Sequence, residues 1–284
     1  MGSRKQGLAK GELRALRDVA IEAARKAANI QRAAIDRPHR VSFKGLRDIV
    51  TEVDRACERV IVETVSSHFP EHGFLLEESP FEATSSPYLW VVDPLDGTMN
   101  FSHGVPHFCC SIALEHCGLP QVGVVVDPVR NEEFTAVRGQ GARLNGKPIR
   151  TSGESRLLYC LLATGFPNDL DNASDTNLAK FTRMLRYAQG IRRTGVAALD
   201  LCYVAAGRFD GYWITKLEHW DAAAGILIVE EAGGRVTDLY GNPADSSTRH
   251  LVVSNGKIHK RMMEILHVSR DRGRHRRPPG RQAY

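Results

Sequence analysis

The sequence lacks the cysteine patterns of a disulfide-rich or zinc-binding protein. Its 284 residues contain six cysteines, but none form a CxxC pair and no histidine follows them at zinc-finger spacing. Disulfide frameworks and structural zinc sites both need such patterns, so neither is indicated. We expect free thiols in a reducing compartment.

Long apolar runs are also missing. The N-terminus has no apolar signal-peptide core, and no run of eighteen apolar residues occurs anywhere in the chain. Position six, where N-myristoylation needs a hydroxyl, holds Gln6. These absences predict a soluble cytoplasmic protein with no membrane partner.

An excess of positive charge is confined to one end of the chain. The formal net charge is +5, and residues 270–284, with six arginines and one aspartate, account for all of it. This end has almost no apolar residues, so we predict that 269–284 is a disordered basic tail. A solvated end is the simpler interpretation, and an arm that binds RNA or a transcription complex is the alternative.

The rest of the chain has the composition of a globular enzyme, with 42% hydrophobic residues. Apolar residues at steps of three and four predict a helix over 11–34, and Thr51 and Asp54 have capping-box spacing at the start of a second helix. Alternating segments separated by turn residues then predict an antiparallel meander. Its strands are expected at 88–92, 107–115, 121–126 and 133–137, with a last piece near Arg143.

The second half of the sequence alternates strands with helices, which is typical of an α/β layer. Strands are predicted at 157–164, 210–215, 235–238 and 251–254, and helices at 176–188, 195–206 and 222–232. We therefore predict two closely packed halves, an N-terminal α+β half (1–150) and a C-terminal α/β half (151–268).

Acidic residues stand beside several apolar segments. Asp93 and Asp96 end the run WVV, Glu77 and Glu78 end the run FLL, and Asp221 precedes an apolar helix. Each has a structural explanation, namely a β-turn, an exposed strand edge or a helix N-cap. Their joint occurrence without histidine or cysteine partners favours a site for Mg²⁺, Mn²⁺ or Ca²⁺. Because Mg²⁺ commonly takes ligands from phosphate groups, the predicted substrate is a phosphate ester.

Two glycines are candidates for an anion-binding backbone. Gly97 precedes Thr98, and Gly195 opens a predicted helix that continues with Val196 and Ala197. Glycine lets the backbone approach a ligand closely, and amides at the start of a turn or helix attract anions. For Gly195 a tight contact between helix and sheet is an equal alternative.

These motifs resemble those of the inositol monophosphatase family of Mg²⁺-dependent, lithium-sensitive phosphatases. The resemblance covers roughly residues 11–268. The motifs that carry it are KGLRDIVTEVD (44–54), LLEES (75–79), WVVDPLDGTMNF (90–101), ATGFP (163–167), RRTGVAALDLCYVAAGRFDGYW (192–213) and WDAAAGILIVEEAGG (220–234). It implies a layered αβαβα sandwich and a homodimer.

The resemblance also implies roles for individual residues. Two to three Mg²⁺ ions are expected, with Asp93 shared between two of them and the third near Glu77. Thr98, hydrogen-bonded to Asp54, is expected to orient and help deprotonate a water molecule. The metal ligands are Glu77, Asp93, the Leu95 carbonyl, Asp96 and Asp221; the catalytic residues are Asp54, Glu77 and Thr98; the substrate-binding residues are Gly97, Thr98, Gly195, Val196, Ala197 and Asp221.

One position departs from the family pattern. Members that act on inositol phosphates usually carry a glutamate seven residues before the position of Asp221, and this sequence has Ile214. An apolar side chain cannot accept hydrogen bonds from inositol hydroxyls. Inositol-1-phosphate is still ranked first, because residues 192–213 resemble that branch. Fructose-1,6-bisphosphate, 3′-phosphoadenosine 5′-phosphate, NADP and histidinol phosphate are the alternatives. Lys216 and Glu218 are either leaving-group contacts or a solvated strand end.

Overall fold

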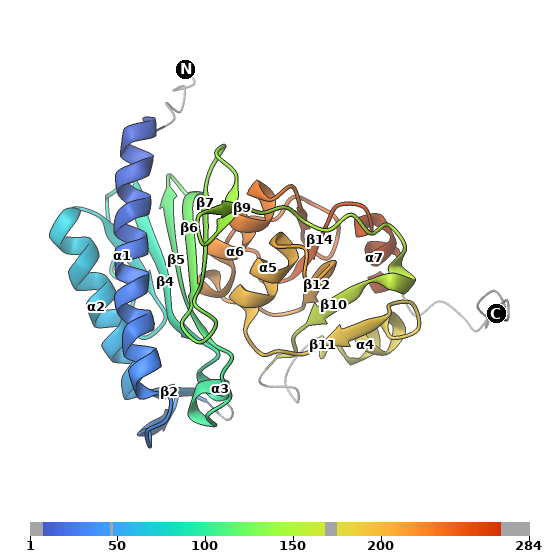
Figure 1. Cartoon of the computed structure of the whole chain (residues 1–284), viewed down its shortest axis with the longest axis horizontal. Helices are drawn as coiled ribbons and strands as arrows, with labels where there is room; N and C mark the ends of the chain where they lie inside the picture. The colour runs from blue at the N-terminus through green and yellow to red at the C-terminus, as the bar shows by residue number, and fades with distance from the viewer. Residues whose placement is uncertain (1–7, 46–47, 168–174, 268–284) are drawn as a thin grey trace, which may run out of the picture.

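The helices and strands form five layers (Figure 1) in the computed structural model, which describes residues 8–45, 48–167 and 175–267. The order is a helix pair, a seven-stranded sheet, a second helix pair, a five-stranded sheet and a third helix pair. The helix pairs are α1 (Lys10–Ala34) with α2 (Glu52–His68), α5 (Ala197–Ala205) with α6 (His219–Glu231), and α4 (Leu178–Met184) with α7 (His259–Leu266). The predicted αβαβα sandwich is confirmed, and the predicted basic tail lies outside the described residues. None of the described helices is long and apolar enough to cross a membrane.

The first layer follows from the sequence pattern. Helix α1 buries a face rich in alanine, and small side chains let α2 pack closely against it. Helix α2 begins at the predicted capping box, in which Thr51 and Asp54 satisfy each other's backbone amides. Between these helices in the chain, β1 (Val41–Phe43) and β2 (Ile49–Thr51) form a short antiparallel pair that was not predicted.

The seven-stranded sheet has the order β3-β4-β5-β6-β7-β8-β9. The predicted meander is confirmed. The sheet also contains β3, which was not predicted and which runs parallel to β4, with Leu76 opposite Val92. Parallel neighbours end at the same edge of a sheet, so the acids that follow β3 and those in the last part of β4 come together there. The strands are β3 (Gly73–Leu76), β4 (Tyr88–Asp96), β5 (Cys109–His116), β6 (Leu119–Asp127), β7 (Glu132–Val137), β8 (Ala142–Leu144) and β9 (Lys147–Pro148).

The five-stranded sheet is mixed, with the order β11-β10-β12-β14-β13. The prediction of a strand over 157–164 was partly wrong, because Leu157–Tyr159 form one 3-10 turn before β10 begins. The helix predicted over 176–188 is shorter, and β11 and α7 were not predicted. The boundary near residue 150 falls between β9 and the 3-10 turn, and the division into two domains stays a prediction. The strands are β10 (Leu161–Thr164), β11 (Gly190–Arg192), β12 (Gly211–Ile214), β13 (Arg235–Thr237) and β14 (Leu251–Ser254).

Three apolar clusters fill the spaces between the layers. Strand alternation sends Trp90 and Val92 toward α1 and α2, while Val91 packs toward α5 and α6. On β12, Trp213 faces the outer helices α4 and α7, and Tyr212 faces inward. Both sheets are therefore buried on both faces, and they clamp α5 and α6 between them.

Helix α6 approaches the first sheet very closely at Gly123 on β6. A Cβ atom at this position would lie 2.8 Å from the carbonyl oxygen of Ala224 and 3.2 Å from its Cα. Both are backbone atoms of α6, so no side-chain rotation relieves the clash. The contact fixes the distance between α6 and the sheet.

We therefore expect Gly123→Ala to lower the free energy of unfolding by about 1–3 kcal/mol, because the helix must move away from the sheet. Equilibrium denaturation in urea measures the effect. The matched control is Gly11→Ala, which adds the same methyl group where no atom lies within 4 Å, in the exposed first turn of α1. Equal stability changes for the two variants would contradict the close-contact argument.

Candidate active site

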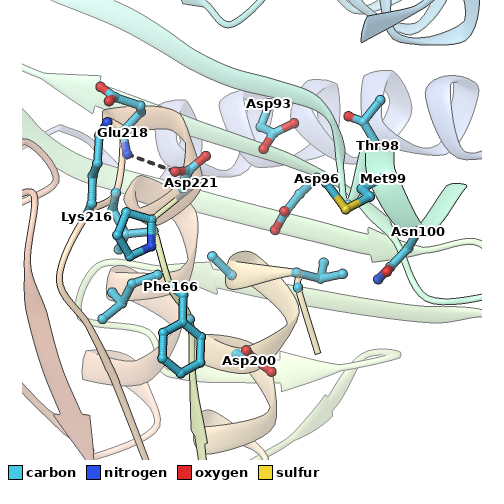
Figure 2. A pocket seen from close by; sticks show the side chains of 18 of the residues that line it. Asp93, Asp96, Thr98, Met99, Asn100, Phe166, Asp200, Lys216, Glu218 and Asp221 are labelled. Atoms are coloured by element: carbon cyan, nitrogen blue, oxygen red, sulfur yellow. Dashed lines mark hydrogen bonds between the residues drawn. The ribbon is translucent and has the colours of Figure 1, made fainter. Parts of the chain in front are cut away.

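A cavity of about 430 Å³ opens where β4 ends and where α5 and α6 begin. Figure 2 shows carboxylates from these segments turned toward it. All the predicted metal-binding and substrate-binding residues line it, and the remaining predicted residue, Asp54, lies behind Thr98. The predicted lining residues are Glu77, Asp93, Leu95, Asp96, Gly97, Thr98, Gly195, Val196, Ala197 and Asp221.

The end of β4 is irregular, and this irregularity lets both Asp93 and Asp96 line the cavity. Asp93 pairs with Ser111, but the next pair is Asp96 with Cys109, so β4 has one residue more than β5 over this step. The Leu95 amide donates to Asp93 Oδ1 at 3.0 Å. Asp93 is only 2% exposed.

Helix N-termini hold two of the acids. The Ala198 amide, in the first turn of α5, donates to Asp96 Oδ2 at 2.7 Å. Asp221, the third residue of α6, accepts from the Glu218 amide at 2.8 Å, the bond drawn in Figure 2. Amides and the positive end of the helix dipole stabilise these negative charges.

The cavity carries far more negative than positive charge. Burial, followed by repulsion from the neighbouring carboxylates, raises the pKa of Asp93 and Asp96 well above its ordinary value. The pKa of Glu77 is also raised, and that of Asp221 reaches about 7, in both cases mainly through burial. Like charges disfavour one another's ionised forms, so these carboxylates can be ionised together only if a cation is shared among them.

One ammonium group already lies at the edge of this cluster. Lys44 Nζ is 2.8 Å from Glu77 Oε1 and 2.8 Å from Glu78 Oε1. Although burial opposes its charge, the two carboxylates raise the pKa of Lys44. Lys44 belongs to a motif noted in the sequence, but no role was predicted for it.

The donor set suits a hard divalent cation. All the ligands that the four acids Glu77, Asp93, Asp96 and Asp221 offer are oxygen atoms, and Leu95, whose carbonyl is a further oxygen donor, also lines the cavity. As they stand, no three acidic, imidazole or thiol side chains within the described ranges are grouped closely enough to enclose an ion. The fit is thus one of ligand chemistry and charge.

Thr98 and Asp54 form the predicted pair. Thr98 Oγ1 lies 2.9 Å from Asp54 Oδ1 and 3.0 Å from the Leu95 carbonyl oxygen. Asp54 is fully buried and also accepts from the Thr51 amide at 2.8 Å, so the α2 capping box fixes the carboxylate. Burial raises the pKa of Asp54, despite these hydrogen bonds.

The turn between β4 and α3 (Thr98–Ser102) requires glycine. Gly97 has φ of 96°, and a Cβ there would lie 2.9 Å from Val196 Cγ2 and 3.2 Å from the His107 carbonyl oxygen. The glycine therefore lets the turn lie directly against the segment before α5. Asn100 joins the same two segments, because its Nδ2 donates to the carbonyls of His107 and Thr194.

Several lining residues were not predicted. Asp200, 2% exposed, accepts from Thr194 Oγ1 at 2.8 Å, and Phe166, Arg193 and Asn100 also face the cavity. An acid inside the otherwise apolar helix that follows Gly195 was a signal for Asp200. The other three lie within the quoted motifs 90–101, 163–167 and 192–213, but no role was predicted for them.

The far end of the cavity contains the residues that the sequence left open. Ile214 is buried and lines the cavity beside the exposed Lys216. Glu218 also lines it, and Arg249 pairs with Glu218 at 2.7 Å. Figure 2 shows Lys216 and Glu218 at the side of the cavity away from Thr98 and Asn100.

Comparisons with known proteins identify the family of the chain. The profile of the inositol monophosphatase family matches residues 12–271. A Pseudomonas aeruginosa protein named Nus factor SuhB is 46% identical over 257 residues, which cover 88% of this chain and 94% of that protein.

Solved structures are similar along nearly the whole chain. An inositol monophosphatase from Anabaena (Nostoc) sp. PCC 7120 superposes with a TM-score of 0.82 at 41% identity, covering 89% of this chain and 96% of that one. An IMPase/NADP phosphatase complexed with Mg²⁺ and phosphate superposes with a TM-score of 0.80 at 25% identity, covering 93% and 99%. The chain therefore belongs to the inositol monophosphatase family and is a Mg²⁺-dependent phosphatase of that family.

Proposed function

We propose that this chain hydrolyses a small phosphorylated polyol, with inositol-1-phosphate ranked first, using two to three Mg²⁺ ions. The observation that carries the proposal is that four carboxylates, those of Glu77, Asp93, Asp96 and Asp221, line one cavity, with a single ammonium group, Lys44, paired to Glu77 at its edge. The proposed ligands are Glu77, Asp93, the Leu95 carbonyl, Asp96 and Asp221, with Asp93 shared between two ions. When bound, the ions supply neutralisation of the phosphoryl and leaving-group oxygens and lower the pKa of the attacking water.

The chain's own groups then position the reactants. Asp54 accepts a hydrogen bond from the Thr98 hydroxyl, so the lone pairs of the Thr98 oxygen can accept a hydrogen bond from the attacking water. In this role Thr98 orients the water and helps to deprotonate it. Glu77 is the third catalytic residue of the proposal. The amides of Gly97 and Thr98 donate to phosphate oxygens, and Gly195, Val196 and Ala197 line the substrate site next to this turn.

The leaving group of the substrate is expected to lie at the far end of the cavity. Ile214 gives the far end of the cavity an apolar surface and Lys216 adds a positive charge there, while Arg193 adds one beside Gly195. Fructose-1,6-bisphosphate, 3′-phosphoadenosine 5′-phosphate, NADP and histidinol phosphate are therefore the alternative substrates. Lithium sensitivity, a homodimer and a cytoplasmic location stay predictions.

A second candidate function is that of a regulator that binds RNA or a transcription complex. Two observations are compatible with it: the relative named Nus factor SuhB at 46% identity, and the arginine-rich residues 270–284. In this proposal the tail neutralises phosphates of the nucleic acid.

Asp93→Asn should reduce Mg²⁺-dependent phosphate release by at least about a hundredfold, because it removes the negative charge of the carboxylate that is proposed to bind two of the ions. Release is measured for each of the five candidate esters with and without Mg²⁺. Asp36→Asn, an exposed residue after α1, is the matched control and should keep wild-type activity. Full activity of Asp93→Asn, or activity of the wild type without divalent cations, would overturn the proposed chemistry.

Ile214→Glu should raise kcat/KM for inositol-1-phosphate relative to histidinol phosphate by about tenfold, since a carboxylate can accept the inositol hydroxyls. Ile214→Leu, which keeps the apolar surface, should leave this ratio unchanged. A ratio that moves equally in both variants would mean that residue 214 does not contact the leaving group.

Deleting residues 270–284 should lower RNA affinity and reduce its dependence on salt if the tail is the binding arm, while phosphate release stays at the wild-type level. Filter binding over a range of salt concentrations measures the affinity. Unchanged RNA binding after the deletion excludes the tail as the contact.

A further inference from the structure

We propose that Glu58 is a positioning residue that sets the place of Glu77 for metal binding. The inference rests on the proposed function, in which Glu77 is a metal ligand. Glu58 lies on α2, one turn after Asp54, and is only 5% exposed. It does not line the cavity, so any effect on metal binding must act through the residues that it contacts.

The Glu58 carboxylate binds the segment that follows β3. One oxygen, Oε2, accepts the backbone amide of Glu78 at 2.9 Å. The other, Oε1, accepts the hydroxyl of Ser79. Both donors are uncharged, and Lys44 pairs with the carboxylates of Glu77 and Glu78.

A buried carboxylate is an expensive way to hold a loop, because its charge is removed from water. It has one advantage over a neutral side chain: both of its oxygens accept, so it can bind the amide and the hydroxyl at once. Hydrogen bonds to an ionised acceptor are also stronger than those between neutral groups. The charge is therefore explained if the position of this segment matters for function.

The position of Glu77 depends on the hydrogen bonds that Glu58 accepts, because the backbone hydrogen bond of Glu77 itself is weak. Its own amide donates to the Val92 carbonyl at 3.3 Å, a long bond at the end of the β3–β4 pairing. The next two residues are those that Glu58 holds. The distance between the carboxylates of Glu77 and Asp93 is therefore governed from α2 as well as from the sheet.

Helix α2 thus supports two parts of the site from one face. Asp54 holds the Thr98 hydroxyl at 2.9 Å, and Glu58, four residues later, holds the segment that carries Glu77. Residues four apart lie next to each other on a helix face. The spacing between the hydroxyl and Glu77 is then set by one rigid element that packs against α1.

The test compares Glu58→Ala and Glu58→Gln with Glu63→Ala, which removes an exposed carboxylate from the same helix. Calorimetry gives the Kd for Mg²⁺, and kinetics give the Mg²⁺ concentration at half-maximal activity and the substrate KM at saturating Mg²⁺. Glu58→Ala should raise the Mg²⁺ Kd by about tenfold or more, because it removes a support of a metal ligand. Substrate KM at saturating Mg²⁺ should not change.

Glu58→Gln keeps one acceptor oxygen but loses the second acceptor and the charge, so its Mg²⁺ Kd should lie between those of the wild type and Glu58→Ala, whereas Glu63→Ala should match the wild type. Amide hydrogen exchange of the metal-free protein gives a readout that needs no activity: the Glu78 amide should exchange faster in Glu58→Ala. If Glu58→Ala does not fold, Ser79→Ala, which removes one of the two donors, is measured instead and should weaken Mg²⁺ binding in the same direction.

The proposal is overturned if the Glu58 variants lose thermal stability while the Mg²⁺ Kd stays at the wild-type value, which is the result of a purely structural role. It is also overturned if Glu58→Gln and Glu58→Ala weaken Mg²⁺ equally. Failure of the proposed function gives a different result, namely wild-type protein that binds Mg²⁺ but releases no phosphate from any ester. Calorimetry still decides the role of Glu58 in that case.

Discussion

Repulsion among carboxylates in one cavity is the constraint on which the rest of this structure depends. Asp93, Asp96, Asp221 and Glu77 are brought together although burial and mutual repulsion raise the pKa of each. The surrounding elements offset this cost with amides from α5 and α6, the bulge at the end of β4 and the ammonium of Lys44. A divalent cation completes the balance, and it explains why so much of the fold is arranged to hold anions in place.

The layered fold supplies the acids from separate elements with fixed relative positions. Parallel pairing of β3 with β4 brings Glu77 beside Asp93, while α6, clamped between the sheets, carries Asp221. The close contact at Gly123 and the buried faces of both sheets hold α6 in position. Helix α2 holds Thr98 through Asp54 and the segment after Glu77 through Glu58, so the site is supported from several layers.

The sequence predicted those features whose cause is local. Capping-box spacing, strand alternation and acids beside apolar runs are visible within a few residues, and so α1, the meander and the cavity-lining carboxylates agree with expectation. The parallel strand β3, the contacts of Asn100 and the roles of Lys44 and Glu58 depend on partners far away in the chain. The sequence predicts a strand at Leu157–Tyr159, where the structure has a 3-10 turn, because a short apolar run fits a strand and a helical turn equally well.

The most direct measurement of the central claim is anomalous diffraction from crystals soaked with Mn²⁺, which substitutes for Mg²⁺ at oxygen sites. The account predicts anomalous peaks within roughly 2.0–2.3 Å of carboxylate oxygens of Asp93 and its neighbours, with Asp93 touching two ions. A protein that remains without a peak in this cavity while Mn²⁺ occupies other surface acids would contradict it.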